Sequence, residues 1–230
     1  WWLDDSTGLC ERSRRDPEIR VLGLTGAGSA FCAGADLKDA LGGDPTPGGP
    51  DFPTRAGAMM QRLRTLPKPV IAVLNGITMA GGLELAMCAD LILAADSAKI
   101  ADAHSNYGFF PGAGGAAILP RLLPLPTSLY MLFTGKSLTA ARLHELGLIS
   151  EVHPAEQLAG AAMELANQLA AKSPSVLRRM KSVARSTADK TLADALNHEQ
   201  AVFREHMASE DCREGLSAFA EKRTPRFTGR

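Results

Sequence analysis

The 230-residue sequence predicts an α/β fold in which a layered core is followed by a mainly helical region. Three observations predict this fold. Strand patterns alternate with helical patterns in the first half, two turns of small residues each follow an apolar strand, and the spacing of apolar residues is nearly all helical from residue 114 onward. With 45% hydrophobic residues, the chain can bury a core large enough for one large domain, or for one domain with an appendage.

The elements expected in the first half alternate along the chain. Strands are expected over residues 19–25, 70–74, 91–95 and 99–103, and helices within 51–66 and over 82–88. A Gly- and Pro-rich stretch at 42–53 has too few apolar residues to pack. We expect a surface loop there, which either covers a site near the first small-residue turn or is simply variable.

The second half is expected to be mainly helical. Thr139 caps a helix that ends near Gly147, and a short extended piece follows at 149–152. Longer helices are expected over residues 155–171, 175–186, 192–207 and 211–222. We therefore divide the chain into a core, residues 1–135, and a mainly helical region, residues 136–230, of a kind that often packs on a neighbouring subunit.

Composition argues against several classes of partner. The 25 basic and 25 acidic side chains give a formal net charge of zero, which provides no electrostatic case for nucleic acid or an anionic membrane surface. No apolar run approaches the roughly 20 residues needed to span a bilayer. The four scattered cysteines lack a C-x-x-C pair, so we expect a reducing compartment, no structural metal and, without a targeting segment, a cytoplasmic protein.

Two turns of small residues are the strongest candidates for a site. The first is Gly26-Ala27-Gly28-Ser29-Ala30-Phe31-Cys32-Ala33-Gly34-Ala35-Asp36-Leu37-Lys38, and the second is Met79-Ala80-Gly81-Gly82-Leu83-Glu84. Small side chains let a ligand approach backbone N–H groups, which is what main-chain donors need in order to hold a negative oxygen. The pair therefore predicts an oxyanion site with a carboxylate base beside it.

Other motifs argue against common alternatives. Gly26-x-Gly28 lacks the third glycine of a dinucleotide fingerprint, because Phe31 stands there, and residues 111–115 lack the lysine of a phosphate-binding loop. The chain has no Gly-x-Ser-x-Gly elbow, which argues against a serine hydrolase. His198-Glu199 is not followed by a second histidine at metalloprotease spacing, so it is assigned to a solvated helix face.

Glu84 and His104 are the candidate catalytic residues. Glu84 lies in an apolar run, where a carboxylate is rare unless it forms a salt bridge or transfers protons. His104 lies just after an expected strand and ahead of the glycine-rich turn, and it is either an ordinary histidine or a proton carrier. Asp102 either orients His104 or caps a turn.

The chain resembles the crotonase superfamily, also called the enoyl-CoA hydratase/isomerase superfamily, from about Asp16 to the C-terminus. The matching segments are specific only when taken together. They are Leu24-Thr25-Gly26-Ala27-Gly28, Phe31-Cys32-Ala33-Gly34-Ala35-Asp36-Leu37, Lys68-Pro69-Val70-Ile71-Ala72, Ala80-Gly81-Gly82-Leu83-Glu84-Leu85-Ala86, Pro111-Gly112-Ala113-Gly114-Gly115, Leu132-Phe133-Thr134-Gly135 and the end of the chain from Glu214 to Phe227.

This resemblance implies a core formed as a spiral of ββα turns and a helical trimerisation region, in a homotrimer or a dimer of trimers. It implies acyl-CoA thioester substrates, with no cofactor apart from the coenzyme A of the substrate. The backbone N–H groups of Ala35 and Gly81 would form the oxyanion hole. The residues expected to line the acyl-CoA channel are Ala33, Asp36, Leu37 and Lys38.

The chain departs from the family pattern at two places. Enoyl-CoA hydratases use two glutamates; Glu84 occupies the first position, and His104 stands at the second. Family members that hydrolyse β-diketones carry a histidine there with an aspartate in the glycine-rich turn, where this chain has Ala113. The family also begins with a β-hairpin and an Asn-Arg-Pro-like segment that helps to bind CoA, and we expect both to be missing here.

Three functions therefore remain open from the sequence. The first is an enoyl-CoA hydratase/isomerase-like enzyme in which Glu84 is the principal acid or base and His104 its partner. The second is a C–C bond hydrolase that uses His104, and the third is a non-catalytic protein that binds acyl-CoA.

Overall fold

The computed structural model describes residues 2–36 and 51–230, without the side chains of residues 2–7. Leu37, Lys38 and most of the surface loop expected at 42–53 therefore lie outside the described residues.

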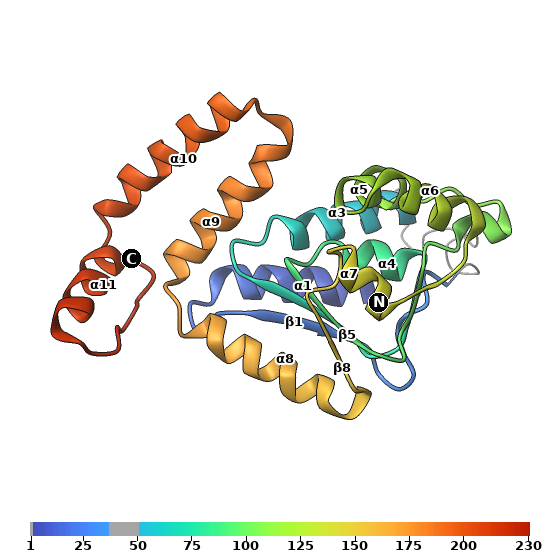
Figure 1. Cartoon of the computed structure of the whole chain (residues 1–230), viewed down its shortest axis with the longest axis horizontal. Coiled ribbons are helices and arrows are strands. Elements are labelled where there is room, and N and C mark those ends of the chain that lie inside the picture. Colours follow the sequence, from blue (N-terminus) through green and yellow to red (C-terminus); the bar gives the residue numbers. More distant parts are fainter. Residues whose placement is uncertain (1, 37–50) are drawn as a thin grey trace.

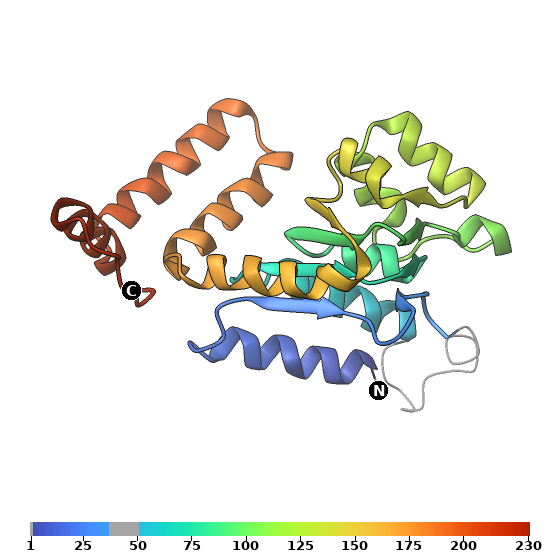
Figure 2. The ribbon, with the colours of Figure 1, turned by 60° about the horizontal axis from the view of Figure 1, so that its bottom comes forward.

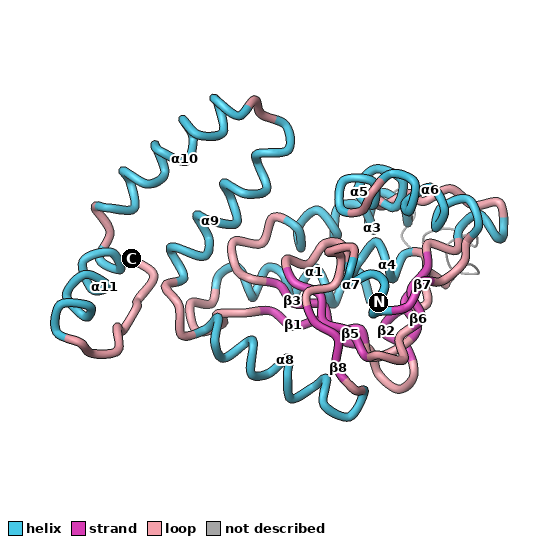
Figure 3. Tube along the Cα trace, in the orientation of Figure 1, coloured by secondary structure: helices cyan, strands magenta, loops and turns pink. Residues whose placement is uncertain are grey.

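The described strands form two four-stranded sheets. The first has the order β1 (Leu22–Thr25), β3 (Val70–Leu74), β5 (Leu91–Ala95), β8 (Glu151–His153), and the second has the order β2 (Ala30–Cys32), β4 (Ile77–Met79), β6 (Lys99–Ala101), β7 (Leu138–Thr139). All neighbours in these sheets are parallel except β6 and β7. The strands lie among the helices of the right-hand part of the molecule (Figure 3).

The chain enters one sheet and then the other in each turn of the core. β1 is followed by β2, β3 by β4 and β5 by β6, and each new pair lies beside the previous pair in both sheets. Helices complete these turns and form the rest of the chain: α1 (Trp2–Arg15), α3 (Phe52–Arg64), α4 (Gly81–Ala86), η1 (His104–Tyr107), α5 (Gly115–Leu122), α6 (Leu125–Thr134), α7 (Ala140–Glu145), α8 (Ala155–Ala170), α9 (Pro174–Ser186), η2 (Thr187–Asp189), α10 (Leu192–Met207) and α11 (Glu210–Glu221). This repetition of two strands and a helix is the expected ββα spiral, and the predicted α/β class is confirmed.

The first sheet is buried between helices. Figure 2 shows α1 and α8 on opposite sides of its strands. Every residue of β3 is buried, as are the last four residues of β5. Parallel strands covered on both faces have uninterrupted apolar sequences, which explains the bounds of 70–74 and 91–95 that the sequence predicted.

Side-chain caps set the starts of α3, which lies within the expected range 51–66, and of α7, whose Thr139 cap the sequence predicted. Asp51 caps α3 by accepting a hydrogen bond from the Thr54 N–H at 2.9 Å. Thr139 caps α7 in the same way, with its Oγ1 3.2 Å from the Arg142 nitrogen. These caps satisfy N–H groups that have no acceptor inside the helix.

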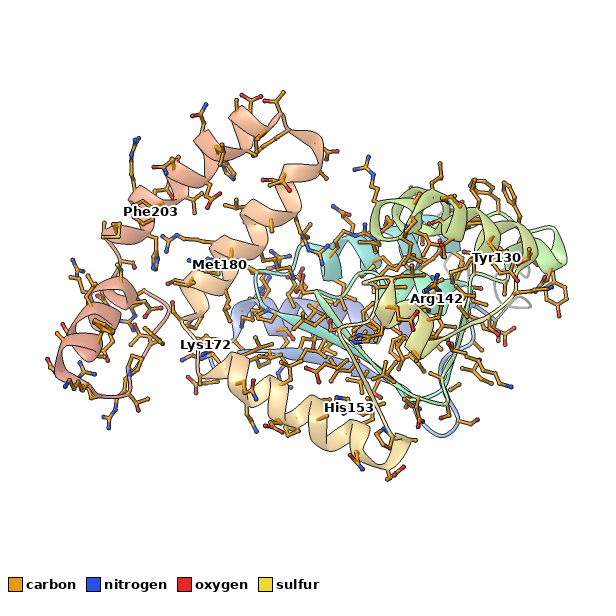
Figure 4. The ribbon with its side chains drawn as sticks, in the orientation of Figure 1. Tyr130, Arg142, His153, Lys172, Met180 and Phe203 are labelled. Carbon is orange, nitrogen blue, oxygen red and sulfur yellow. The ribbon has the colours of Figure 1, made fainter. Side chains whose placement is uncertain are left out.

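The last three helices, α9 to α11, form an arm that extends from the core (Figure 1). Asp90 anchors this arm, because it accepts hydrogen bonds from Lys181 and Arg185 of α9, each at 2.6 Å. Met180 of α9 and Phe203 of α10 are 62% and 55% exposed, and both are labelled in Figure 4. The division of the chain at residue 135 and the role of the arm in trimerisation stay predictions.

None of the helices within residues 2–36 and 51–230 combines the length and the apolar character needed to cross a bilayer.

Candidate active site

The two small-residue turns lie next to each other. β2 and β4 are parallel neighbours, so the segments that follow their carboxyl ends meet at the same edge of the second sheet. A Cβ atom built on Gly81 would lie 3.8 Å from the backbone nitrogen of Ala35 and 3.8 Å from the Cα atom of Gly34. Two backbone segments that are 46 residues apart in the chain are thus brought into contact.

This close approach depends on the absence of side chains. A Cβ atom on Gly82 would overlap the carbonyl oxygen of Cys32, and one on Gly34 would lie 3.3 Å from the Cβ atom of Ala80. Gly34 also has a φ of 109°, which other residues rarely adopt. The small residues in both turns therefore have a structural reason as well as a functional one.

Ala80 turns the chain from β4 into α4 in a strained conformation. Its φ of 51° and ψ of −121° are unusual for a residue with a Cβ atom, and its N–H donates to the carbonyl oxygen of Ala101 at 3.2 Å. Gly81 follows as the first residue of α4. Its N–H has no acceptor within that helix and is available to an external oxygen.

Glu84 is buried on α4, directly below the glycine-rich turn. Its side chain is 3% exposed, and its Oε1 atom accepts hydrogen bonds from the N–H groups of Ala113 and Gly115, both at 2.8 Å. Figure 1 shows α5, which begins at this turn, next to α4. Within the described residues these N–H groups, and not a basic side chain, are the partners of Glu84, so the structural salt bridge is not what buries it.

His104 forms a pair with Asp102. The His104 Nδ1 atom lies 2.9 Å from Asp102 Oδ1, and the two side chains are 14% and 1% exposed. The hydrogen bond to Asp102 raises the pKa of His104; burial opposes this rise, and the charges of Asp102 and Glu84 add to it. Asp102 Oδ1 also accepts the backbone N–H of His104 at 3.4 Å, so the structure shows a contact for each of the two roles that the sequence left open, orienting the imidazole and capping the turn.

Gly115 connects the two acidic residues of the site. Its N–H holds Glu84, and a Cβ atom on it would lie 2.6 Å from Asp102 Oδ2. That oxygen is buried and has no hydrogen-bond partner among the described residues. Glu84, Asp102 and His104 are thus arranged around one turn. In this arrangement the Asp102 carboxylate can stabilise a positive charge on the imidazole, and the Glu84 carboxylate is left to act on a substrate.

The remaining predicted residues are placed less fully. Ala33, Ala35 and Asp36 are exposed and follow β2, whereas Leu37 and Lys38 lie outside the described residues. Their contact with a substrate stays a prediction. No group of three or more His, Cys, Asp or Glu residues suited to a metal ion occurs in the part of the chain that is described.

Sequence reasoning did not identify the N–H groups of Ala113 and Gly115 as the partners of Glu84. These donors belong to the backbone, so no residue type marks them. The one signal in the sequence was the glycine-rich turn itself. Its Gly115 has no side chain, and this leaves room for the carboxylate of Asp102.

The fold and the site define a class of enzymes: a ββα spiral with two apposed small-residue turns beside a buried glutamate is the arrangement that the resemblance to crotonases implies. The chain matches the model of the enoyl-CoA hydratase/isomerase family over residues 3–230. It is 40% identical over 220 residues to the 1,2-epoxyphenylacetyl-CoA isomerase of Escherichia coli K12, covering 94% of this chain and 84% of the relative. It is 38% identical over 226 residues to the carnitinyl-CoA dehydratase of Proteus mirabilis, covering 95% and 85%.

The solved structures agree with the curated relatives. The enoyl-CoA hydratase of Bacillus anthracis superposes with a TM-score of 0.91 at 33% identity, over 99% of this chain and 88% of that one. The chain belongs to the enoyl-CoA hydratase/isomerase family. It is an enzyme of the lyase or isomerase kind, and the similar proteins include hydratases, dehydratases and isomerases.

Proposed function

We propose that the protein hydrates a 2-enoyl-CoA thioester, or catalyses the reverse dehydration, through an enolate held by two backbone N–H groups. The observation that carries this proposal is the contact between the Ala35 and Gly81 turns, with the buried Glu84 three residues further along α4. The similarity to hydratases and dehydratases that act on CoA esters supports the same substrate class.

The Ala35 and Gly81 N–H groups would bind the thioester oxygen. Addition of water to the β-carbon converts the C=C bond into an enolate, whose negative charge lies largely on that oxygen. Donors already held by the fold stabilise this charge more than they stabilise the neutral substrate, which lowers the barrier. Ala33, Asp36, Leu37 and Lys38 would line the channel for the acyl-CoA, and no cofactor beyond the substrate's own CoA is required.

Glu84 and His104 would divide the proton transfers between them. The carboxylate of Glu84 takes a proton from water while the water oxygen bonds to the β-carbon. His104 is suited to act as the acid because its pKa is raised, and it donates a proton to the α-carbon of the enolate. The proton that Glu84 took from water then moves to His104 and restores both residues, so that the net change is the addition of one water molecule.

Hydration of crotonyl-CoA tests this proposal. Turnover removes the absorbance of the conjugated thioester, and 3-hydroxybutyryl-CoA is the expected product. We expect Glu84→Gln and His104→Gln each to lower kcat by about 100-fold or more, the usual contribution of a positioned acid or base. If the protein binds crotonyl-CoA but hydrates neither crotonyl-CoA nor longer enoyl-CoA thioesters, this result would contradict the proposal and favour an acyl-CoA-binding protein.

A C–C bond hydrolase is the second candidate, and the Asp102–His104 pair is the observation that favours it. In that reaction His104 acts as a base: water adds to the β-carbonyl of a β-ketoacyl-CoA, and the bond between the α- and β-carbons breaks. The products are a carboxylic acid and an acyl-CoA enolate, and the enolate takes back the proton that His104 removed from water. Release of acetyl-CoA from acetoacetyl-CoA, without hydration of crotonyl-CoA, would favour this alternative.

A further inference from the structure

We propose that Asp102 is the positioning residue for His104: it fixes the imidazole with Nδ1 toward the protein and Nε2 toward the substrate. This inference rests on the proposed function, in which His104 transfers a proton.

The hydrogen bond leaves only one ring nitrogen for chemistry. An ionised carboxylate accepts but does not donate, so the His104 Nδ1 atom, 2.9 Å from Asp102 Oδ1, must carry a proton. The other nitrogen, Nε2, is then the atom that gains or loses a proton. A second bond, from the His104 N–H to the same oxygen at 3.4 Å, holds the two residues in one orientation.

The local backbone brings the two side chains together. Ala103, which separates Asp102 from His104, is in the left-handed conformation with a φ of 60°. This turn bends the chain from β6 into η1, so the two side chains meet across a single residue. A left-handed non-glycine residue carries a cost in conformational energy, so the surrounding structure must hold this turn in place.

The position of Asp102 is also tied to the candidate oxyanion hole. Asp102 directly follows Ala101, the last residue of β6, and the Ala101 carbonyl accepts the N–H of Ala80 at 3.2 Å. Gly81 directly follows Ala80. A rigid strand pair therefore fixes the spacing between Asp102 and the Gly81 N–H, and the imidazole held by Asp102 inherits this position.

The second oxygen of Asp102 indicates that this carboxylate is not placed for stability alone. Asp102 is 1% exposed, and its Oδ2 atom is buried without a hydrogen-bond partner among the described residues. A buried carboxylate oxygen in this state is destabilising unless a nearby positive charge compensates. Imidazolium at His104 supplies that charge, so Asp102 and protonated His104 stabilise each other.

The charged groups around His104 agree with this role. Asp102, which follows β6, and Glu84 from α4 both act on it, and both favour the protonated ring. Helix α6, which packs against η1, has no Asp, Glu, Lys or Arg in its sequence, and its one titratable side chain, Tyr130, is 46% exposed. The sum of these influences favours imidazolium, the form that donates a proton.

Nitrogen-15 NMR of histidine-labelled protein tests the inference directly. We expect His104, identified by the loss of its signals in His104→Gln, to keep a proton on Nδ1 throughout the titration and to titrate above the ordinary pKa of about 6.5. In Asp102→Asn the His104 pKa should fall, because burial of the ring then acts without the carboxylate. Wild-type His104 with its neutral-form proton on Nε2 would overturn the proposal, whether or not the variant folds.

The pH dependence of kcat separates positioning from a merely structural role. If His104 is the acid, kcat falls at high pH as the ring loses its proton, and Asp102→Asn should move this fall to lower pH and reduce the maximal kcat by about 100-fold. A folded Asp102→Asn variant in which both the His104 pKa and the pH–rate profile are unchanged would overturn the inference, whereas a lowered His104 pKa with an unchanged profile would contradict the proposed function of His104 as the acid.

Glu151→Gln is the matched control. His153 Nε2 lies 2.8 Å from Glu151 Oε2, which is a second histidine–carboxylate pair, at the junction of β8 and α8 (Figure 4). This variant should alter the NMR signals of His153 and leave the pH–rate profile unchanged. If wild-type protein turns over no enoyl-CoA, the proposed function fails, while the NMR titration still decides whether Asp102 positions His104.

Discussion

Glu84→Gln separates the structural role of this side chain from its chemical role. Glutamine has nearly the same shape as glutamate and keeps an oxygen that accepts the N–H groups of Ala113 and Gly115, now 2.8 Å from Oε1. It has no carboxylate to take a proton from water. The substitution should therefore leave the turn in place and remove the base.

The expected loss of stability follows from these two hydrogen bonds. A bond to a charged acceptor contributes about 1.5–3 kcal/mol and a neutral one about 0.5–1.5 kcal/mol, so the change costs about 1 kcal/mol per bond, or about 2 kcal/mol in total. For a chain of this size that lowers the melting temperature by about 4–8 °C. Glu84→Ala should cost about 4 kcal/mol or more, because it leaves two N–H groups without partners and opens a cavity.

The assay compares melting temperatures with the rate of crotonyl-CoA hydration. We expect Glu84→Gln to remain folded at 25 °C and to lose about 100-fold or more in kcat. The control is Glu145→Gln, which removes an exposed ion pair with Arg142 and should change neither quantity measurably. A folded Glu84→Gln variant within threefold of the wild-type kcat would refute the assignment of Glu84 as the base.

Two further predictions concern the backbone contact and the C-terminal arm. Gly82→Ala places a Cβ atom against the Cys32 carbonyl oxygen and should separate the two turns, lowering kcat by about 100-fold, whereas Gly23→Ala, with no atom within 4 Å of its new Cβ, should keep full activity. Asp211→Asn should destabilise the arm: burial raises the pKa of Asp211, but hydrogen bonds from two serine hydroxyls and two tail N–H groups outweigh it and lower that pKa. The stability it provides is therefore present above the unfolded-state pKa of about 3.9 and is lost as the pH falls through the lower folded-state pKa. Thermal melts between pH 7 and 3 should show a smaller acid-induced loss in the variant, and equal losses in both proteins would contradict this reasoning.

The sequence predicted the bounds of those elements that are marked by an uninterrupted apolar run or by a capping residue. The bounds of β3, β5 and α10 match the expected ranges, because buried parallel strands are wholly apolar and Thr191 caps α10 by accepting the Asp194 N–H at 3.2 Å. β2 and β4 were not separated from the turns that follow them. Strands of three residues are too short to show alternation, and each of these two runs into its turn without a break residue.

The candidate site was predicted where side-chain type carries information. Glu84 was found because a carboxylate in an apolar run is unusual. The hydrogen bonds that hold it come from backbone N–H groups, which leave no mark in the sequence. From the sequence, Asp102 could either orient His104 or cap a turn. The left-handed conformation of Ala103 brings the two side chains together, and nothing in the sequence marks this alanine as left-handed.

A crystal structure with a bound saturated acyl-CoA thioester such as butyryl-CoA, which has no C=C bond to hydrate, tests the central claim most directly. We predict that the carbonyl oxygen at the thioester position lies about 2.7–3.1 Å from both the Ala35 and the Gly81 nitrogens. Glu84 and the Nε2 atom of His104 should face the α- and β-carbons. A carbonyl oxygen bound away from these two N–H groups, or bound there with Glu84 and His104 remote from the reacting carbons, would contradict the account.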